Sequence, residues 1–182
     1  MRLASVEGDD PFITRLYARD TSLFYVYYQE VLMPEEKKAH SEWMSKGNLL
    51  TSTGRFAEAV SAFDKALEEN PKDAEAWNNR GIALVNANMA SEALKSFEKA
   101  RNLDSKHTDA WYNMGVVLSC LGRYDEAIKS LRKAIEANPD NAYAWNNLGM
   151  IFKHLNREAE ANEAFKKAGG LNVRRQGSCH RC

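Results

Sequence analysis

The sequence predicts an all-α fold of antiparallel helix pairs stacked on one another, and three observations support this prediction. First, the segments AWNNRGIALV, AWYNMGVVLS and AWNNLGMIFK begin at Ala76, Ala110 and Ala144, so nearly the same line recurs every 34 residues. Such a period is typical of proteins built from stacked repeats. Second, apolar residues within each segment are three or four positions apart, as on one helical face. Third, the 182-residue chain is 44% hydrophobic and 27% charged, which suits an ordered helical protein.

Residues 1–39 precede the repeats and are predicted to form an aromatic-rich helical extension. Phe24, Tyr28 and Val31 lie at positions i, i+4 and i+7, so they form one apolar stripe. Pro34 suits the first turn of the next helix, which is therefore expected to begin early. The extension either caps the open face of the first repeat, or serves a partner or another copy of the chain, or folds into the chain's own binding groove.

Four repeats follow, at residues 40–73, 74–107, 108–141 and 142–172. In this register five positions keep the same kind of residue in every copy. They are Trp43, Trp77, Trp111 and Trp145 at position 4; Gly47, Gly81, Gly115 and Gly149 at position 8; Ala59, Ala93, Ala127 and Ala161 at position 20; Phe63, Phe97, Leu131 and Phe165 at position 24; and Ala66, Ala100, Ala134 and Ala168 at position 27. Chance cannot plausibly align five columns in four copies, so each repeat is interpreted as one layer of a stack.

The repeated positions have physical roles in this interpretation. Small residues let two helices approach closely, because a larger side chain would push their backbones apart. A glycine inside a helix costs about 1 kcal/mol relative to alanine, so a glycine in every copy indicates a packing requirement. Pro71 and Pro139 follow the second helices of two repeats and end them, because proline cannot continue a helix.

This pattern resembles the tetratricopeptide repeat family, and the resemblance runs from Ser41 to about Ala168. It implies a right-handed α-solenoid in which the first helix of each pair lines a concave groove. One repeat cannot bury its apolar face alone and about three are needed for a stable array, so four suffice. The Trp, Ala and Phe columns are then expected to pack the core.

Position 6 of the repeats is polar: Ser45, Asn79, Asn113 and Asn147. Asparagine is unfavourable inside a helix, because its amide competes for backbone hydrogen bonds, and packing does not require it. In the family this position faces the concave surface, and the three asparagines resemble the ladder with which some members hold an extended peptide by its backbone. An amide both donates and accepts hydrogen bonds, so it suits this role. Alternatively, these residues are solvated positions inherited by duplication.

The predicted peptide-binding groove contains amides and apolar side chains and few charges. Its candidate residues are Asn48, Asn78, Asn79, Ile82, Tyr112, Asn113, Val116, Asn146, Asn147 and Met150. Some family members bind the C-terminal carboxylates of heat-shock chaperones through a clamp of two asparagines and three cations. Asn48 and Asn79 match the asparagines, but Met44, Asp109 and Asn113 occupy the cation positions. A carboxylate would meet no cation there and one repelling aspartate, so neither this function nor a highly acidic ligand is expected.

The second helix of the fourth repeat is expected to stop at Gly169-Gly170, with no clear capping helix after it. Terminal repeats generally need a polar cap. We therefore hypothesise that the outer face of this helix packs against another chain or another repeat array. The main alternative to an adaptor is thus a self-assembling homo-oligomeric scaffold, joined through this end or through residues 1–39.

The last segment, 173–182, is predicted to be a flexible tail rich in Cys and Arg. Cys179 and Cys182 form a Cys-x-x-Cys pair, which supplies half a structural zinc site at best, so they are only weak metal candidates. Thiol exchange is a further option, and a tail without any site is the expectation. Cys120, late in a first helix, is expected to be a buried or groove thiol and not a reactive one.

The remaining features exclude several classes of function. Lys plus Arg equals Asp plus Glu, at 25 each, so the balance gives no general attraction to nucleic acid. There is no phosphate-binding loop, zinc-protease motif or nucleophile elbow, and no apolar run long enough to cross a membrane. The prediction is a non-catalytic cytoplasmic adaptor that needs no cofactor and binds a protein or peptide partner.

Overall fold

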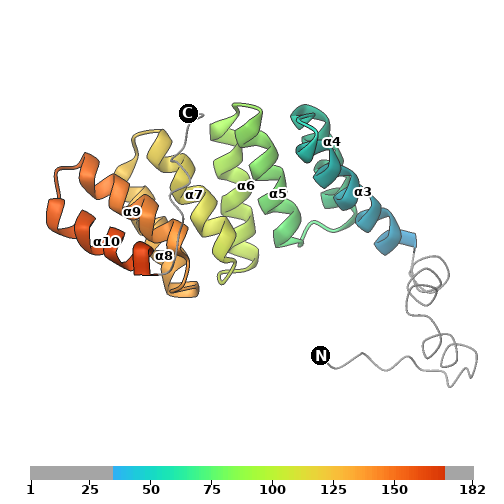
Figure 1. The fold of residues 1–182 in the computed structure, drawn as a ribbon. Helices are drawn as coiled ribbons and strands as arrows, with labels where there is room; N and C mark the ends of the chain where they lie inside the picture. The colour runs from blue at the N-terminus through green and yellow to red at the C-terminus, as the bar shows by residue number, and fades with distance from the viewer. Residues whose placement is uncertain (1–34, 171–182) are drawn as a thin grey trace, which may run out of the picture.

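The computed structural model describes residues 35–170, and within this range the chain forms eight α-helices and no strand (Figure 1). They are α3 (Glu35–Ser52), α4 (Phe56–Glu69), α5 (Ala74–Asn86), α6 (Ala90–Leu103), α7 (Thr108–Cys120), α8 (Tyr124–Ala137), α9 (Ala142–His154) and α10 (Glu158–Gly170). The predicted all-α solenoid of stacked helix pairs is confirmed. The predictions for the N-terminal extension up to residue 34, and for residues 171–182, lie outside the described residues.

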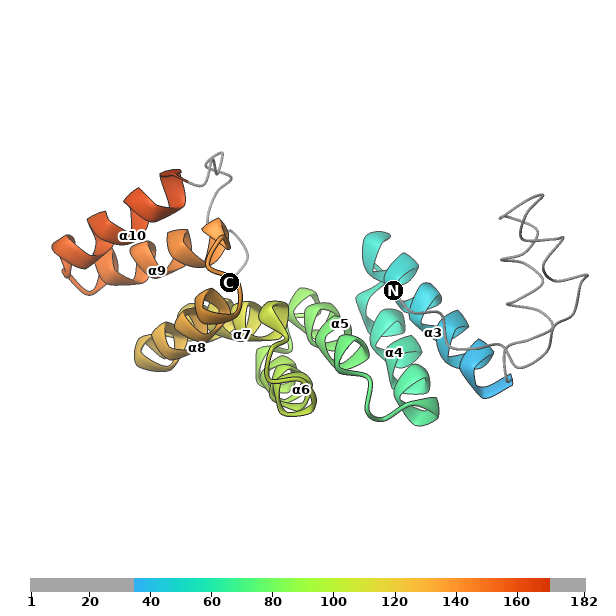
Figure 2. The same ribbon diagram turned by 90° about the horizontal axis from the view of Figure 1, so that it is seen from below.

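The helices pack as four antiparallel pairs, α3–α4, α5–α6, α7–α8 and α9–α10. The second helix of each pair also contacts the first helix of the next pair, and successive first helices touch one another. Figure 2 shows the pairs following one another in a single row. Each layer therefore contacts mainly its neighbours, as in a repeat protein.

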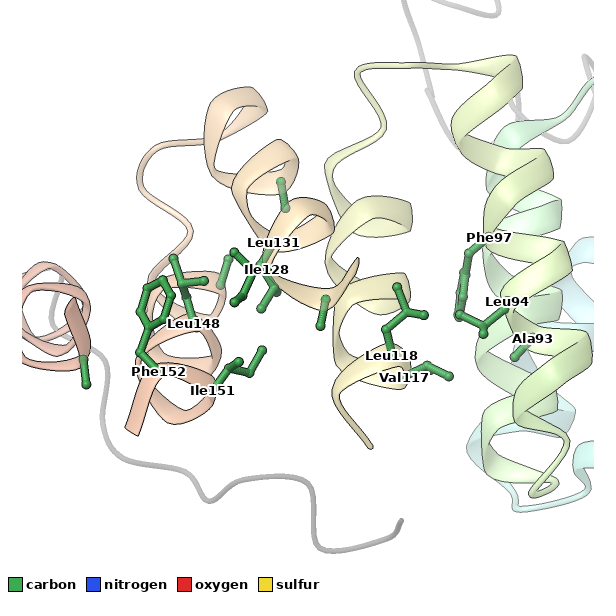
Figure 3. Packing of buried hydrophobic residues seen from close by; sticks show 14 of the residues in the cluster. Ala93, Leu94, Phe97, Val117, Leu118, Ile128, Leu131, Leu148, Ile151 and Phe152 are labelled. Atoms are coloured by element: carbon green, nitrogen blue, oxygen red, sulfur yellow. The ribbon is translucent and has the colours of Figure 1, made fainter. Parts of the chain in front are cut away.

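The core of the described residues consists of two clusters of buried side chains, one in the first repeat that reaches Ala83 on α5 and one in the later repeats. Within the last three repeats one cluster of buried side chains extends from Leu84 on α5 to Ala161 on α10. Figure 3 shows Val117 and Leu118 of α7 pointing toward Phe97 of α6, so side chains meet across the boundary between repeats. Because neighbouring layers share this core, one repeat alone would expose much of its apolar surface to water.

Three of the tryptophans form hydrogen bonds to the turns between repeats, in addition to packing against the helices. The indole Nε1 atoms of Trp77, Trp111 and Trp145 donate hydrogen bonds to the carbonyl oxygens of residues 71, 105 and 139, at 2.9, 3.0 and 3.0 Å. The acceptor is a main-chain carbonyl oxygen, which every residue has. Ser105 can therefore accept the bond as well as the prolines at the other two turns do. The expectation of core packing was incomplete, since the indole ring is only partly buried.

The turn inside each repeat contains one residue with a positive φ. These residues share position 15 of the register and are Gly54 (78°), Asn88 (62°), Gly122 (73°) and Asn156 (56°). Glycine adopts this left-handed conformation without strain, and asparagine tolerates it better than most other residues. The alternation of Gly and Asn at this position therefore follows from the backbone geometry of the turn.

The exposed side of α10, the last described helix, carries polar residues. Its buried residues, Ala161, Ala164 and Ala168, point inward, whereas Glu158 and Asn162 are exposed. In the third repeat the same positions are apolar, and Ile128 is buried against the fourth repeat's layer. The hypothesis that this face packs against another chain or another repeat array stays a prediction.

Candidate peptide-binding surface

The ten predicted groove residues all lie on the first helices of the four pairs. Asn48 is on α3, and the other nine are shared equally among α5, α7 and α9. These helices are neighbours in the stack, since α3 contacts α5, α5 contacts α7 and α7 contacts α9. We call the face formed by the ten residues the amide surface.

A chain of amide hydrogen bonds crosses three of these helices. Asn79 Nδ2 donates to Asn48 Oδ1 at 3.4 Å, and Asn78 Nδ2 donates to Asn79 Oδ1 at 3.3 Å. Asn113 Nδ2 then donates to Asn78 Oδ1 at 3.0 Å. The asparagines therefore join α3, α5 and α7, a structural role that neither alternative from the sequence included.

The same arrangement continues between α7 and α9. Asn147 Nδ2 lies 3.2 Å from the Tyr112 hydroxyl and 2.9 Å from the Tyr143 carbonyl oxygen, and it donates to both. Thus Asn113 and Asn147, both at position 6, donate to position 5 of the preceding repeat, which is Asn78 or Tyr112. The sequence contains polar residues at positions 5 and 6 of successive repeats. Only the packing of the helices shows that position 6 bonds to position 5 of the preceding repeat.

Hydrogen-bonding capacity remains on this surface after these bonds are made. Asn78 is 4% exposed and belongs to the interior. Asn79, Asn113 and Asn147 are partly exposed, and the Oδ1 atoms of Asn113 and Asn147 accept no hydrogen bond from residues 35–170. Asn146 is also partly exposed, and its side chain has no hydrogen-bond partner in that range. The surface can therefore still accept bonds from a ligand and donate bonds to it.

The apolar members of the surface differ in accessibility. Ile82 and Tyr112 pack against the core and are partly buried, and Val116 is partly buried as well. Met150 is 45% exposed, and Tyr143, seven residues earlier on α9, is 57% exposed. Residues seven apart share a helical face, so Tyr143 and Met150 lie on the same side of α9.

The charges near the surface are few and mostly acidic. Glu75 and Asp109 occupy position 2 on α5 and α7, and both are exposed. Lys153 lies near the end of α9 and is also exposed. The first two carboxylates favour a neutral or cationic ligand over an acidic one.

The strongest perturbations of titratable groups lie away from this surface, at the starts of second helices. Arg123 Nε and Nη2 each lie 2.7 Å from a carboxylate oxygen of Glu126. These hydrogen bonds lower the pKa of Glu126 and raise the pKa of Arg123. Arg55 with Glu58 and Arg157 with Glu160 repeat the pair, with the same directions and the same main cause. The pairs repeat with the helices, which identifies them as structural.

Surface hollows also occur between the second helices. One lies between α8 and α10 around Trp145, and another between α6 and α8 around Trp111. Both contain residues of both charges, Arg132 and Glu136 among them. Neither hollow includes a member of the amide surface, so these are separate features of the stack.

Cysteine chemistry differs from the expectation in one respect. Cys120 is partly exposed and disulfide-bonded, so it is not the free thiol that the sequence predicted. Within residues 35–170 no group of three or more His, Cys, Asp or Glu side chains could hold a metal ion. The weak metal candidates Cys179 and Cys182 lie outside the described residues.

Comparisons with known proteins agree with this architecture. Three models of the tetratricopeptide repeat match residues 44–110, 108–141 and 130–162, which together run continuously from residue 44 to 162. No curated protein sequence matches the chain significantly. No helix in the described range is both long and apolar enough to cross a membrane.

Solved structures with similar folds cover most of the chain. The crystal structure of MamA has a TM-score of 0.70 and 21% identity, and the match covers 91% of this chain and 96% of that one. PilF of Pseudomonas aeruginosa has a TM-score of 0.70 and 26% identity, covering 76% of this chain and 64% of that one. The first repeat domain of Spaghetti (RPAP3), bound to the HSP90 peptide SRMEEVD, has a TM-score of 0.63 and 24% identity, covering 65% and 94%.

Proposed function

Since the chain belongs to the tetratricopeptide repeat family, we propose that it is a non-catalytic adaptor that binds an extended protein segment along the amide surface. Proteins of this family are generally interaction modules and not enzymes, and the proposal assigns no catalytic residue and no cofactor. The segment would rest its backbone on Asn79, Asn113, Asn146 and Asn147. A cytoplasmic location, predicted from the sequence, is part of the proposal.

The observation that carries the proposal is the unused hydrogen-bonding capacity of the amides. Asn113 and Asn147 use a donor to join neighbouring helices, which fixes the orientation of each amide. Their Oδ1 atoms accept nothing from residues 35–170, so they can accept from a ligand's backbone N–H groups. An amide that is already oriented loses little conformational entropy on binding, which favours affinity.

Apolar side chains beside the amides would select the ligand's side chains. Met150 and Tyr143 are exposed on α9, where a large apolar side chain could be covered. Methionine adapts its shape to its partner, and tyrosine offers both an apolar ring and a polar tip. Side-chain specificity is thus proposed to reside at the α9 end, and backbone recognition along α5, α7 and α9.

An acidic C-terminal peptide is not the proposed ligand. The Spaghetti domain with a similar fold holds an HSP90 peptide that ends in acidic residues. Here Met44, Asp109 and Asn113 stand where the chaperone clamp has cations, and Asn48 and Asn79 are hydrogen-bonded to each other. A neutral or cationic segment fits the exposed Glu75 and Asp109 better.

The alternative of a self-assembling scaffold has less support. Polar residues on the outer face of α10 make one of its two proposed contacts less favourable, and the other rests on residues that the structure does not describe. Self-association remains an outcome that the binding experiment would detect, because further copies of this chain would be captured.

The test compares variants that change the amide surface with variants that do not. Wild type, Asn79→Ala/Asn147→Ala and the matched control Asn102→Ala/Asn162→Ala would be used to capture partners from native lysate. The control residues are exposed asparagines on second helices. Overlapping peptides of a captured partner are then titrated against each protein after circular dichroism has shown that all are folded.

Each backbone hydrogen bond contributes about 0.5–1.5 kcal/mol, so the double surface variant should weaken peptide binding about tenfold, and the control should not. N-methylation of single peptide bonds in the ligand should weaken binding to wild type at alternate positions. Equal binding by the surface variant and the control would contradict the proposal, as would binding that is indifferent to N-methylation.

A further inference from the structure

The hollow between α6 and α8 is lined by more cations than carboxylates. Its volume is about 490 Å³, which lies within the range of ligand pockets, about 300–1,000 Å³. Trp111 and Met114 of α7 also line it. We call this feature the basic hollow. Its charged lining residues are Arg101 on α6 and Glu126, Lys129, Arg132, Lys133 and Glu136 on α8.

Both carboxylates of the basic hollow are already engaged. Glu126 accepts two hydrogen bonds from Arg123, which is not part of the lining. Glu136 accepts a hydrogen bond of 2.6 Å from Lys133. Each carboxylate therefore has a cation of its own, and the other cations of the lining remain without a counter-charge at ion-pair distance.

These remaining cations are Arg101, Lys129 and Arg132. Their side chains form no hydrogen bond or ion pair with residues 35–170. Glu126 attracts Lys129, and Glu160 attracts Arg132, without forming an ion pair. Lys129 and Arg132 are exposed, so an incoming anion can reach them. The hollow is thus a site of positive charge that the described structure leaves unpaired.

Arg101 is held in position by the aromatic ring beside it. Its guanidinium carbon Cζ lies 4.9 Å from the ring centroid of Trp111, whose indole is itself bonded to the Ser105 carbonyl oxygen at 3.0 Å. Arg101 Nε is buried and has no hydrogen-bond partner in the part of the chain that the structure describes. A guanidinium matches a carboxylate with two parallel hydrogen bonds, and a donor that is already oriented loses little entropy on binding.

We propose that the basic hollow binds a short acidic segment of a partner protein. Carboxylate side chains of the segment pair with Arg101 from one side and with Lys129 and Arg132 from the other. Trp111 and Met114 cover an apolar side chain next to the acidic ones. The site is new relative to the amide surface and does not depend on the function proposed for that surface.

The charges of the neighbouring layers limit the length of this ligand. Glu160 and Glu163 line the adjacent hollow toward α10. In the first repeat, α4 exposes Glu68 and Glu69. A long polyanion such as nucleic acid would meet these carboxylates as well as the cations, and would be repelled by them. A short acidic segment meets the cations of the hollow alone.

The basic hollow and the amide surface use opposite sides of α7. Trp111 and Met114 are three residues apart and share one side of the helix. At 3.6 residues per turn, Tyr112, Asn113 and Val116 lie on the other side. Both sites can therefore be occupied at the same time. A neutral or cationic segment on the amide surface and an acidic segment in the hollow would then be joined by one chain.

Fluorescence anisotropy with a defined probe tests the proposal. The probe is a fluorescein-labelled peptide of alternating Glu and Leu, and its counterpart has Gln in place of every Glu. Wild type should bind the Glu peptide at least about tenfold more tightly, since hydrogen bonds between charged groups are strong. Arg101→Gln should remove most of this difference, and Arg101→Lys should restore only part of it, because an ammonium group cannot form the paired bonds. Equal binding of the two peptides to wild type would overturn the proposal.

A pair of double variants separates the hollow from a general effect of charge. Lys129→Gln/Arg132→Gln removes two exposed cations from the hollow, and Lys72→Gln/Lys166→Gln removes two exposed cations elsewhere. Circular dichroism first shows that both are folded. The first should weaken binding of the Glu peptide about tenfold and the second should leave it near wild type, with smaller differences at high salt. Equal losses in the two variants would overturn the site.

Nuclear magnetic resonance locates the bound peptide. The Nε–H signal of Arg101, assigned by its loss in Arg101→Gln, should shift when the Glu peptide is added and stay in place with the Gln peptide. A signal that the Glu peptide does not move would overturn the proposal. Tighter binding by a single-stranded oligonucleotide of the same net charge would overturn the assignment to an acidic protein segment.

The same titration distinguishes this proposal from the proposed function. Asn79→Ala/Asn147→Ala alters the amide surface, so it should leave the affinity for the Glu peptide unchanged. A loss in that variant would place the peptide on the amide surface and overturn the inference. Binding of the Glu peptide in the hollow by a chain whose amide surface captures no partner would leave this inference standing and contradict the proposed function.

Discussion

At Gly81 the close approach of two helices leaves no room for a larger residue. A methyl group in place of its hydrogen would lie 2.5 Å from Phe97 Cε1, closer than atoms pack. The glycines at the same position of the other repeats face the same obstacle, from Phe63, Leu131 and Phe165. The packing requirement that the sequence indicated is therefore a contact between position 8 and position 24.

The change Gly81→Ala should lower the free energy of unfolding by about 1–3 kcal/mol, because the core must shift to accept the methyl group. Gly169→Ala is the matched control, since nothing lies within 4 Å of a Cβ there and the residue is helical. It should be neutral or stabilise by up to about 1 kcal/mol, because alanine favours the helix. Urea unfolding followed by circular dichroism measures both, and the same sign for both changes would contradict this explanation.

Gly122 is fixed by backbone conformation and not by space. Its φ is 73° and no atom lies within 4 Å of a Cβ at this position. Gly122→Ala should therefore destabilise the protein by about 1 kcal/mol through strain alone. Gly122→Asn should cost less, because Asn88 and Asn156 adopt this conformation in two other repeats. Thermal unfolding of both variants tests this order, and an alanine variant as stable as wild type would refute it.

At the scale of elements, arginine–glutamate pairs stabilise the first turns of three second helices. In α8, Arg123 precedes the helix and Glu126 lies in its first turn. A carboxylate near a helix N-terminus also interacts favourably with the helix dipole. In the second repeat Met89 takes the place of the arginine, so α6 begins without this pair.

The pair of Arg123 and Glu126 predicts that its contribution to folding stability falls at low pH. Because hydrogen bonding to Arg123 lowers the pKa of Glu126 in the folded state, the ionised carboxylate stabilises the fold above the unfolded-state pKa. This contribution is lost as the pH falls through the lower, folded-state pKa. Carboxyl-selective NMR should show Glu126 titrating below an ordinary glutamate, and Arg123→Gln should raise its pKa.

Lys99→Gln, an exposed change on α6, is the control for that titration and should leave Glu126 unaffected. An unchanged titration of Glu126 in Arg123→Gln would show that the pair does not persist in solution. Both side chains are about half exposed, so added salt should weaken the effect.

At the scale of the whole molecule, the stack ends in a layer whose outer positions have become polar. Glu158 and Asn162 occupy the positions of Tyr124 and Ile128, which in the third repeat cover the next layer. A polar outer layer satisfies the requirement that a terminal repeat be soluble. The last described pair thus serves as its own cap.

Placing apolar residues on the outer face of α10 should turn this polar face into an interface between copies of the chain. The change Glu158→Tyr/Asn162→Ile gives α10 the outer residues of α8, so we expect concentration-dependent self-association through the exposed apolar patch. Light scattering after size-exclusion chromatography measures the mass. The control Asn102→Ile, on the exposed face of α6, should not associate, and a double variant that stays monomeric at high concentration would contradict the assignment of this face.

The sequence by itself determined the repeat, the helix pairs and the candidates for the amide surface. A 34-residue period and the spacing of apolar residues depend only on the geometry of a helix, so they can be read without tertiary information. Position 6 was identified because asparagine is unfavourable inside a helix unless it has another role. That reasoning led to Asn79, Asn113 and Asn147.

Only the tertiary structure decided what these residues contact. The bonds from Asn113 to Asn78 and from Asn147 to Tyr112 join residues 35 positions apart, and no local rule predicts them. Which side of α10 is exposed depends in the same way on which side of the helix meets its neighbour. Helical periodicity shows that a residue shares a face with others, but whether that face meets the core, another helix or solvent is decided by packing.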